Sequence, residues 1–201
     1  GGRYWLANHQ FNFRMDSIIL ASQSPRRKQL LEAAEISFTI DVADVDESVP
    51  QGMSASIVPG FLAEKKAAVI LQRNPKAVVI AADTIVVVEE EIIGKPKDAA
   101  DAYQILEKLS GRKHVVITGV CIQNATKKKV FSCSTSVYFR PLTNEQIAHY
   151  VTHYHPMDKA GAYAIQEWIG MIGIEKIEGD YYNVMGLPIG ELVAQLKSFT
   201  E

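Results

Sequence analysis

The segment 22–28 (SQSPRRK) combines residue types that could bind a phosphate group. It follows a short apolar run at residues 18–21, which is typical of a buried strand, and Ser24 before Pro25 is typical of a helix start. The first helical turn would then carry three cations, Arg26, Arg27 and Lys28. Each cation opposes the helix dipole by a few tenths to about 1 kcal/mol, unless an anion binds to the serine hydroxyl, the free N–H groups and the arginines. The sequence therefore favours a phosphate site over an exposed basic turn.

A second candidate is Asp83, which we expect to end the apolar strand at residues 77–82. A carboxylate at the mouth of a buried strand is costly unless it meets a metal, a cationic partner or a ligand. A cap on the following turn is the alternative, and the residues alone leave both open. Further candidates for the same site are Glu47, Lys66 and Lys95. A lone lysine on a helix, such as Lys66, is more often solvated.

Two later segments combine charge with small residues, at positions 158–166 (DKAGAYAIQ) and 179–188 (GDYYNVMGLP). The first ends with Gln166 after a short apolar strand, and the second is expected to be a loop before the last helix. Ordinary turn chemistry is the alternative for both. His114 is interpreted as a strand histidine with satisfied polar atoms. The three later histidines lack a Cys or Glu at zinc-ligand spacing, and we interpret them as a helix surface and its end.

The elements that must position these residues alternate between strand and helix along the chain. Strands are expected at residues 18–21, 38–42, 77–82, 114–123, 130–140, 163–165 and 173–177, with residues 84–88 continuing in an extended conformation after Asp83. Helices are expected from residue 25, at 61–72 after a Pro59-Gly60 breaker, and at 98–110, 143–152 and 188–199. A hairpin signal at residues 124–127 argues against a purely parallel sheet. The sequence predicts an α/β protein with a mixed sheet, without the common dinucleotide or P-loop fingerprints.

Length and composition restrict the class of protein. The 201 residues are 47% apolar and 22% charged, which is enough to build a real core. The net charge of −2 argues against a nucleic-acid partner. The two cysteines are too few for a disulfide scaffold and suit a reducing cytoplasm. No apolar run approaches the roughly 20 residues of a membrane span, so no membrane partner is expected.

The first fourteen residues have no periodicity, precede Met15 and lack a long apolar stretch. We interpret residues 1–14 as an artificial extension left from expression, and not as a secretory signal. Residues 15–201 are expected to form a single domain.

Taken together, the motifs resemble those of the Maf family of nucleotide pyrophosphatases. The matching segments, in family order, are ASQSPRRKQLL, AADTIV, GKP, GRKHVVITGV, DKAGAYAIQ and GDYYNVMGLP, and they cover residues 17–201. The resemblance implies an elongated α/β fold, shared with inosine-triphosphate pyrophosphatases, with a cleft between two lobes. It implies hydrolysis of a nucleoside triphosphate to the monophosphate and pyrophosphate, with a divalent cation, Mg²⁺ or Mn²⁺.

The resemblance also implies roles for individual residues. Asp83 takes the role of general base and touches the metal, with Glu47 as a metal or water partner. The phosphate charge would be neutralised by Ser24, Arg26, Arg27, Lys66 and Lys95. Both Lys65 and Lys66 could align with the family's single lysine, and Lys66 is favoured because it directly precedes Ala67.

Three residues resemble the branch of the family that acts on dTTP and UTP. These are Arg26, Thr84 and Gln166, whereas the branch associated with 7-methyl-GTP carries SPWR, a Gln after the Asp, and a late Glu. A glutamine amide matches the N3–H donor and an adjacent carbonyl of uracil or thymine. Guanine presents two adjacent donors, which suit a carboxylate better.

Two other classes of function stay open. Members of this family are linked to septum formation, so the chain could be a nucleotide-binding regulator of cell division with little turnover. An RNA-binding module using Arg26 and Arg27 is disfavoured by the net charge and by the lack of an aromatic and basic stripe. The residues are compatible with a homodimer and do not fix the oligomeric state.

Overall fold

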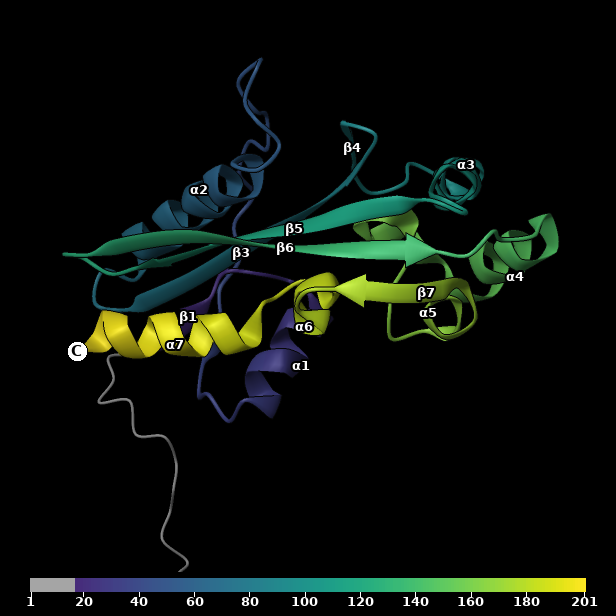
Figure 1. Ribbon diagram of the computed structural model, residues 1–201. Coiled ribbons are helices and arrows are strands. Elements are labelled where there is room, and N and C mark those ends of the chain that lie inside the picture. The colour runs from purple at the N-terminus through teal and green to yellow at the C-terminus, as the bar shows by residue number, and fades with distance from the viewer. Residues whose placement is uncertain (1–16) are drawn as a thin grey trace, which may run out of the picture.

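Long antiparallel strands form the centre of the protein, and the computed structural model describes residues 17–201 (Figure 1). The expectation for residues 1–14 lies outside the described residues. The strands are β1 (Ile18–Leu20), β2 (Thr39–Ile40), β3 (Val78–Val88), β4 (Glu91–Ile93), β5 (Lys113–Gln123), β6 (Lys128–Phe139) and β7 (Ile174–Glu178). The helices are α1 (Pro25–Ala33), α2 (Val58–Arg73), α3 (Ala99–Leu109), α4 (Asn144–Tyr154), α5 (Trp168–Gly173), α6 (Tyr181–Met185) and α7 (Ile189–Thr200). Two 3₁₀ turns, Pro156–Asp158 and Ala160–Ala162, follow α4.

All the strands described belong to one mixed sheet in the order β2-β1-β3-β5-β6-β7, with β4 paired to β3. β1 runs parallel to β2 and β3, whereas β3, β5, β6 and β7 pair antiparallel. The predicted hairpin between β5 and β6 is present, and the Asn124 side chain closes it by accepting the N–H groups of Thr126 and Lys127. The prediction of a mixed sheet flanked by helices is therefore confirmed.

Three groups of helices cover the sheet (Figure 1). At one end, α2 packs on one face through Ala63, Ala67 and Ile70, while α1 and α7 cover the opposite face. At the other end, α3, α4 and α5 enclose a separate apolar cluster around Leu106 and Tyr150. The molecule therefore has a core at each end of the long strands, as two lobes require, and the middle of β3 lies between them.

The start of α2 differs from the expectation, because the helix begins at Val58 and includes Pro59 and Gly60. Proline is tolerated in the first turn of a helix, where its missing N–H has no helical partner. This turn passes directly over β5: a Cβ at Gly119 would lie 2.1 Å from the Gly60 nitrogen. The Pro-Gly pair therefore lies in the first turn of the helix, and Gly60 allows this turn to contact the sheet closely.

Three other predicted elements are wrong. Asp83 does not end a strand, since β3 continues through it to Val88 and Asp83 is paired with Gly119 of β5. Residues 163–165 form no strand, because the left-handed backbone at Gly161 (φ 75°) and Ala162 (φ 59°) turns the chain away from the sheet. The segment 179–188 contains α6, capped by the Asp180 side chain, and is not simply a loop.

Candidate active site

One cavity of about 940 Å³ lies in the middle of the molecule, and all nine predicted site residues line it. They come from α1 (Arg26, Arg27) with its N-cap Ser24, from the segment after β2 (Glu47), from α2 (Lys66), from β3 (Asp83, Thr84), from the turn after β4 (Lys95) and from the turn before α5 (Gln166). Residues more than 140 positions apart in the sequence therefore meet at one cavity.

The Asp83 carboxylate forms the centre of an ion cluster. Lys66 Nζ lies 3.0 Å from Asp83 Oδ1 and 3.5 Å from Glu47 Oε1. Asp83 and Lys66 are largely buried, with side chains 17% and 20% exposed, whereas Glu47 is 63% exposed. The Lys66 ammonium therefore orients Asp83 toward the cavity and offsets the cost of its burial in the sheet.

The structure separates the two adjacent lysines of α2. Lys65 Nζ donates to the backbone carbonyls of Asp46 (3.0 Å) and Ser48 (3.2 Å) and does not line the cavity. Ser48 also donates its hydroxyl and N–H to the Asp46 carboxylate, and these bonds lower the pKa of Asp46. Lys65 thus fastens the loop that carries Glu47, while Lys66 faces the cavity.

The first turn of α1 is built as the sequence predicts, with Ser24 Oγ accepting the Arg27 N–H at 3.2 Å. Its cations, however, already have protein partners. Lys28 pairs with Glu32 at 3.9 Å and lies outside the cavity, and Arg26 pairs with Asp158 at 3.4 Å at the cavity wall. The opposition to the helix dipole is thus partly relieved within the protein.

The Arg27 guanidinium donates hydrogen bonds to three oxygens of the protein. Nε donates to the Gly186 carbonyl at 2.7 Å, and the two terminal nitrogens donate to Thr84 Oγ1 at 2.9 Å and Ser22 Oγ at 3.4 Å. Burial lowers the pKa of Arg27 to about 10, while the Asp83 carboxylate opposes this shift, so the guanidinium stays charged at neutral pH. Arg27 therefore joins α1, β3 and the end of α6 and brings one fixed positive charge to the cavity.

The remaining predicted residues stand at the edges of the cavity. Thr84 is not a free hydroxyl, because it is also bonded to Thr118 Oγ1 at 2.8 Å. Lys95 is exposed after Gly94, whose carbonyl accepts the Gly161 N–H at 3.2 Å. Gln166 is exposed on the turn before α5, and the expectation that it follows a strand is wrong.

The histidines lie where the sequence predicts, but the expectation that the polar atoms of His114 are satisfied is wrong for Nδ1, which is buried without a partner among the described residues. His114 is 1% exposed in β5, its Nε2 meets the Tyr163 hydroxyl, and burial lowers its pKa to about 4. His149 and His153 lie on α4, and His155 follows its end. Within residues 17–201 no group of three or more His, Cys, Asp or Glu side chains is arranged to hold a metal ion.

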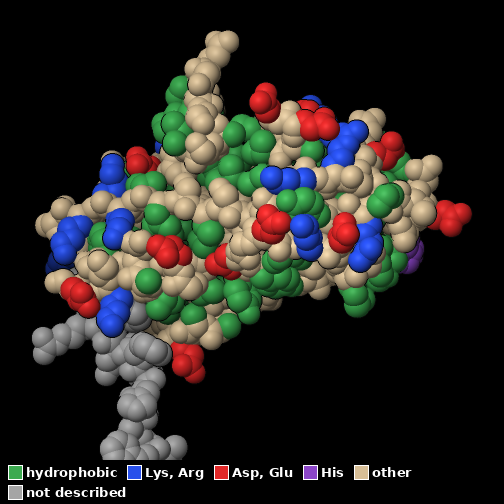
Figure 2. All heavy atoms as spheres, in the orientation of Figure 1, with side chains coloured by type: hydrophobic (Ala, Val, Ile, Leu, Met, Phe, Trp, Pro, Cys, Tyr) green, Lys and Arg blue, Asp and Glu red, His purple; other side chains and the backbone are tan. Residues whose placement is uncertain are grey.

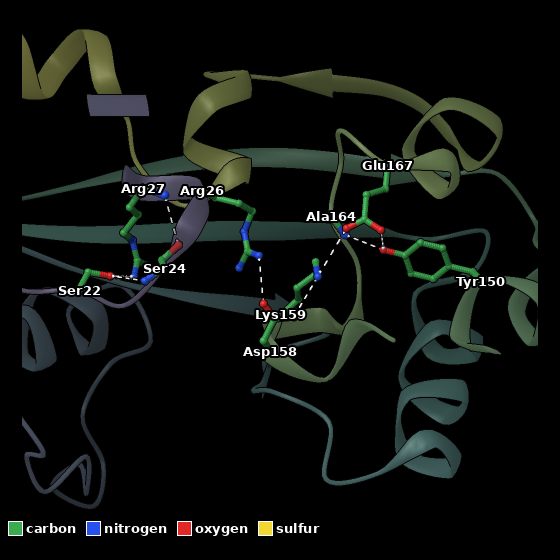
Figure 3. A network of polar contacts seen from close by, with 9 residues as sticks. All are labelled: Ser22, Ser24, Arg26, Arg27, Tyr150, Asp158, Lys159, Ala164 and Glu167. Carbon is green, nitrogen blue, oxygen red and sulfur yellow. Dashed lines mark hydrogen bonds and ion pairs between the residues drawn. The ribbon is translucent and has the colours of Figure 1, made fainter. Parts of the chain in front are cut away.

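Sequence reasoning missed a chain of polar contacts on the cavity wall (Figure 3). Lys159 pairs with Asp158 and Glu167, and Tyr150 links Glu167 to the backbone of Ala164. The motif at residues 158–166 includes Asp158 and Lys159, but Glu167 lies one residue beyond it and Tyr150 lies in a separate helix, α4.

Comparison with known proteins places this geometry in a family. The family model described as "Maf-like protein" matches residues 17–199. The chain belongs to the Maf family. It is 47% identical to a dTTP/UTP pyrophosphatase of Cytophaga hutchinsonii over 94% of this chain and 86% of that one. It is 45% identical to a dTTP/UTP pyrophosphatase of Porphyromonas gingivalis over 94% of this chain and 98% of that one.

The fold of this Maf protein also extends beyond its family. A HAM1 protein from Coxiella burnetii shares the fold, with a TM-score of 0.50 and 16% identity over 92% of this chain and all of that chain. Figure 2 shows lysines and arginines interspersed with acidic side chains on the face in view. In the part of the chain that the structure describes, no helix is long and apolar enough to cross a membrane.

Two carboxylates on the acidic side of the cavity, Asp83 and Glu47, are the candidates to hold the divalent cation that the resemblance implies. Asp83 and Glu47 both pair with Lys66 Nζ, so the two carboxylates lie on the same side of the cavity. Mg²⁺ is usually bound by one or two carboxylates together with phosphate oxygens and water, and not by an all-protein cage. Asp83 and Glu47 would therefore hold Mg²⁺ or Mn²⁺ jointly with a bound nucleotide.

Proposed function

We propose that this Maf protein hydrolyses dTTP and UTP to the nucleoside monophosphate and pyrophosphate. The observation that carries the proposal is the position of Asp83, whose carboxylate lies in the cavity beside Lys66 and near the α1 helix start. The names of relatives at 45–47% identity support the same activity.

Asp83 acts as the general base in this proposal. It accepts a proton from the water that attacks the α-phosphorus, and the α–β bridging oxygen leaves with pyrophosphate. Lys66 holds the carboxylate in place through its 3.0 Å contact with Oδ1. The pairing of β3 with β5 fixes the backbone at Asp83, so its carboxylate is held on a rigid element.

The triphosphate meets the positive side of the cavity. Arg27 is held by three protein oxygens, so Arg26, Lys95 and the Ser24 helix start are the groups able to reorganise around the phosphates. Binding of the triphosphate would compete with Asp158 for Arg26. The divalent cation bound by Asp83 and Glu47 would supply Lewis-acid neutralisation of phosphate charge.

Gln166 reads the base in this proposal. Its amide can accept from N3–H and donate to a carbonyl of uracil or thymine, whereas guanine would leave an unmatched donor. A mismatched pair of this kind costs about 1–3 kcal/mol, or roughly 5- to 150-fold in discrimination. The Thr84 hydroxyl is hydrogen-bonded to Arg27 and Thr118, so it is not a free donor for the base. Its role in this proposal is that a small side chain leaves room for the base.

A nucleotide-binding regulator of septum formation with little turnover is not favoured. The carboxylate needed for hydrolysis is present in the cavity, and the relatives are named for pyrophosphatase activity. A cytoplasmic location, the identity of the metal and a homodimer stay predictions, as does a single domain over residues 15–201.

The test is hydrolysis of UTP, dTTP, CTP, GTP and 7-methyl-GTP in ¹⁸O-labelled water. We expect UTP and dTTP to be preferred, with pyrophosphate as a product and the label in the monophosphate, because water attacks the α-phosphorus. Asp83→Asn keeps the size of the side chain and should lower kcat at least about 100-fold, the lower range for loss of a general base. Label in pyrophosphate or near-normal turnover of a folded Asn variant would refute the mechanism.

A further inference from the structure

The turn that carries Gln166 has few backbone constraints. Residues 163–167 belong to no helix or strand, and they follow the left-handed pair Gly161 and Ala162. Within the turn the Glu167 N–H donates to the Ala164 carbonyl at 3.1 Å. The Glu167 carbonyl in turn accepts the Gly170 N–H of α5 at 3.0 Å, but no such backbone bond involves Gln166 itself among the described residues, so its position also depends on side chains.

A chain of side chains supplies those constraints (Figure 3). The Ala164 N–H donates to the Tyr150 hydroxyl at 3.0 Å, and this hydroxyl donates to Glu167 Oε2 at 3.3 Å. The other carboxylate oxygen, Oε1, lies 3.5 Å from Lys159 Nζ. The Tyr150 hydroxyl therefore binds the chain before and after Gln166: it accepts from the backbone of Ala164 and donates to the side chain of Glu167.

The burial of this chain gives it rigidity. Tyr150 is fully buried within the α3–α4 core, and Lys159 is 9% exposed despite its charge. Burial and the Glu167 carboxylate raise the pKa of Tyr150, so the phenol keeps its proton and remains a donor. A charged lysine with so little exposure needs its carboxylate partners, and here they are Asp158 at 2.9 Å and Glu167.

The same chain reaches the phosphate side of the cavity. Asp158 pairs with Lys159 and also with Arg26 of α1, at 3.4 Å. Arg26 and Gln166 both line the cavity, but Arg26 lies in α1 and Gln166 lies in the turn before α5, far apart in the sequence. The chain Arg26–Asp158–Lys159–Glu167–Tyr150 therefore connects the helix that would hold the triphosphate to the turn that would hold the base.

We propose that Tyr150, Glu167 and Lys159 are positioning residues that set the pyrimidine preference by fixing the turn of Gln166. This inference rests on the proposed function, since it assigns how the base is read at that same cavity. A displacement of about 1 Å in a recognition group can cost up to roughly 100-fold, so a loosened turn should weaken discrimination without touching the hydrolytic groups.

The central variant is Tyr150→Phe, which removes one hydroxyl and leaves the ring in the core. The matched control is Tyr154→Phe, the same change on the same helix at an exposed ring that stacks on Tyr150. For Tyr150→Phe we expect KM for UTP to rise about 10-fold with kcat within about 2-fold, and GTP kinetics to change less than about 2-fold. The Tyr154→Phe variant should match the wild type.

Glu167→Gln is the second variant, because it lies at a more exposed position and keeps both size and an acceptor for Tyr150. It removes the charge that Lys159 needs, and we expect the preference for UTP over GTP to fall about 3-fold. Amide hydrogen exchange gives a readout independent of turnover: the Ala164 N–H should exchange at least about 10-fold faster in Tyr150→Phe.

The results separate this inference from the proposed function. Wild-type protein that releases no pyrophosphate, or that prefers a purine, overturns both. If the wild type prefers UTP, but both folded variants keep the wild-type ratio of UTP to GTP, only the positioning role is overturned. A lower Tm with an unchanged ratio counts as that same outcome, since it shows a merely structural role. If Tyr150→Phe does not fold, the ratio in Glu167→Gln decides.

Discussion

Acid should destabilise this protein through one buried histidine. His114 lies in β5 with 1% exposure, stacks on Phe139 and meets the Tyr163 hydroxyl through Nε2. Its Nδ1 is buried and has no hydrogen-bond partner among the described residues. A second proton on this ring would therefore place an unpaired charge in the core, and burial lowers the pKa to about 4 from the ordinary 6.5.

The sign of the pH effect follows from the two pKa values. Because the folded pKa is the lower one, the unfolded chain binds more protons between pH 6.5 and pH 4, and stability falls as the pH falls through that window. At pH 8 the contribution is negligible. At pH 5 it reaches about 2 kcal/mol, which corresponds to a Tm lower by roughly 4–8 °C for a chain of this size.

The assay is urea unfolding at several pH values between 8 and 5, followed by intrinsic fluorescence. His114→Gln keeps a neutral polar group at every pH, so its free energy of unfolding should fall by about 2 kcal/mol less than that of the wild type over this range. His149→Gln, at an exposed position on α4, is the matched control and should retain the wild-type dependence. An equal fall in the His114→Gln and wild-type proteins would refute the assignment.

The other predictions concern the cavity. Gln166→Glu places an oxygen opposite a base carbonyl, so kcat/KM for UTP and dTTP should fall about 10-fold or more, while GTP is harmed less; an equal loss for every nucleotide would make Gln166 merely structural. A crystal grown in phosphate or sulfate should show an anion within hydrogen-bond reach of the Ser24 helix start and Arg26, and an Arg26 side chain that keeps its pairing with Asp158 and leaves the anion elsewhere would contradict the cradle.

The sequence was sufficient to predict the elements with strong local signals. Ser24 caps α1, as its place before Pro25 predicts, and the predicted helices 98–110 and 143–152 correspond to α3 and α4, which Asp98 and Thr143 cap. These predictions succeed because a cap is decided within four residues of sequence. The alternation of strands and helices was equally readable, and it predicted the mixed sheet.

The errors occur where tertiary contacts decide. Asp83 reads as a strand end because a carboxylate is a poor strand residue, yet the pairing with β5 carries β3 five residues further, to Val88. Ala164 and Ile165 read as a strand because both are apolar. They are indeed buried, but they lie in a turn and not in a strand. Local preference therefore fails at two of the segments that line the cavity, as is common at functional sites.

The cations in the first turn of α1 correctly indicated that partners are needed there, but the partners of Arg27 are groups of the protein. Three cations against a helix dipole predicted a missing partner, and the structure supplies Arg27 with partners that lie 57 and 159 positions away, Thr84 and Gly186. No local pattern could have named them. These bonds join α1, β3 and the end of α6 through groups of the protein itself, so the fold fixes the position of the Arg27 charge. Such a preorganised charge does not have to be rearranged during the reaction, which is the condition under which electrostatic stabilisation of phosphate oxygens is most effective.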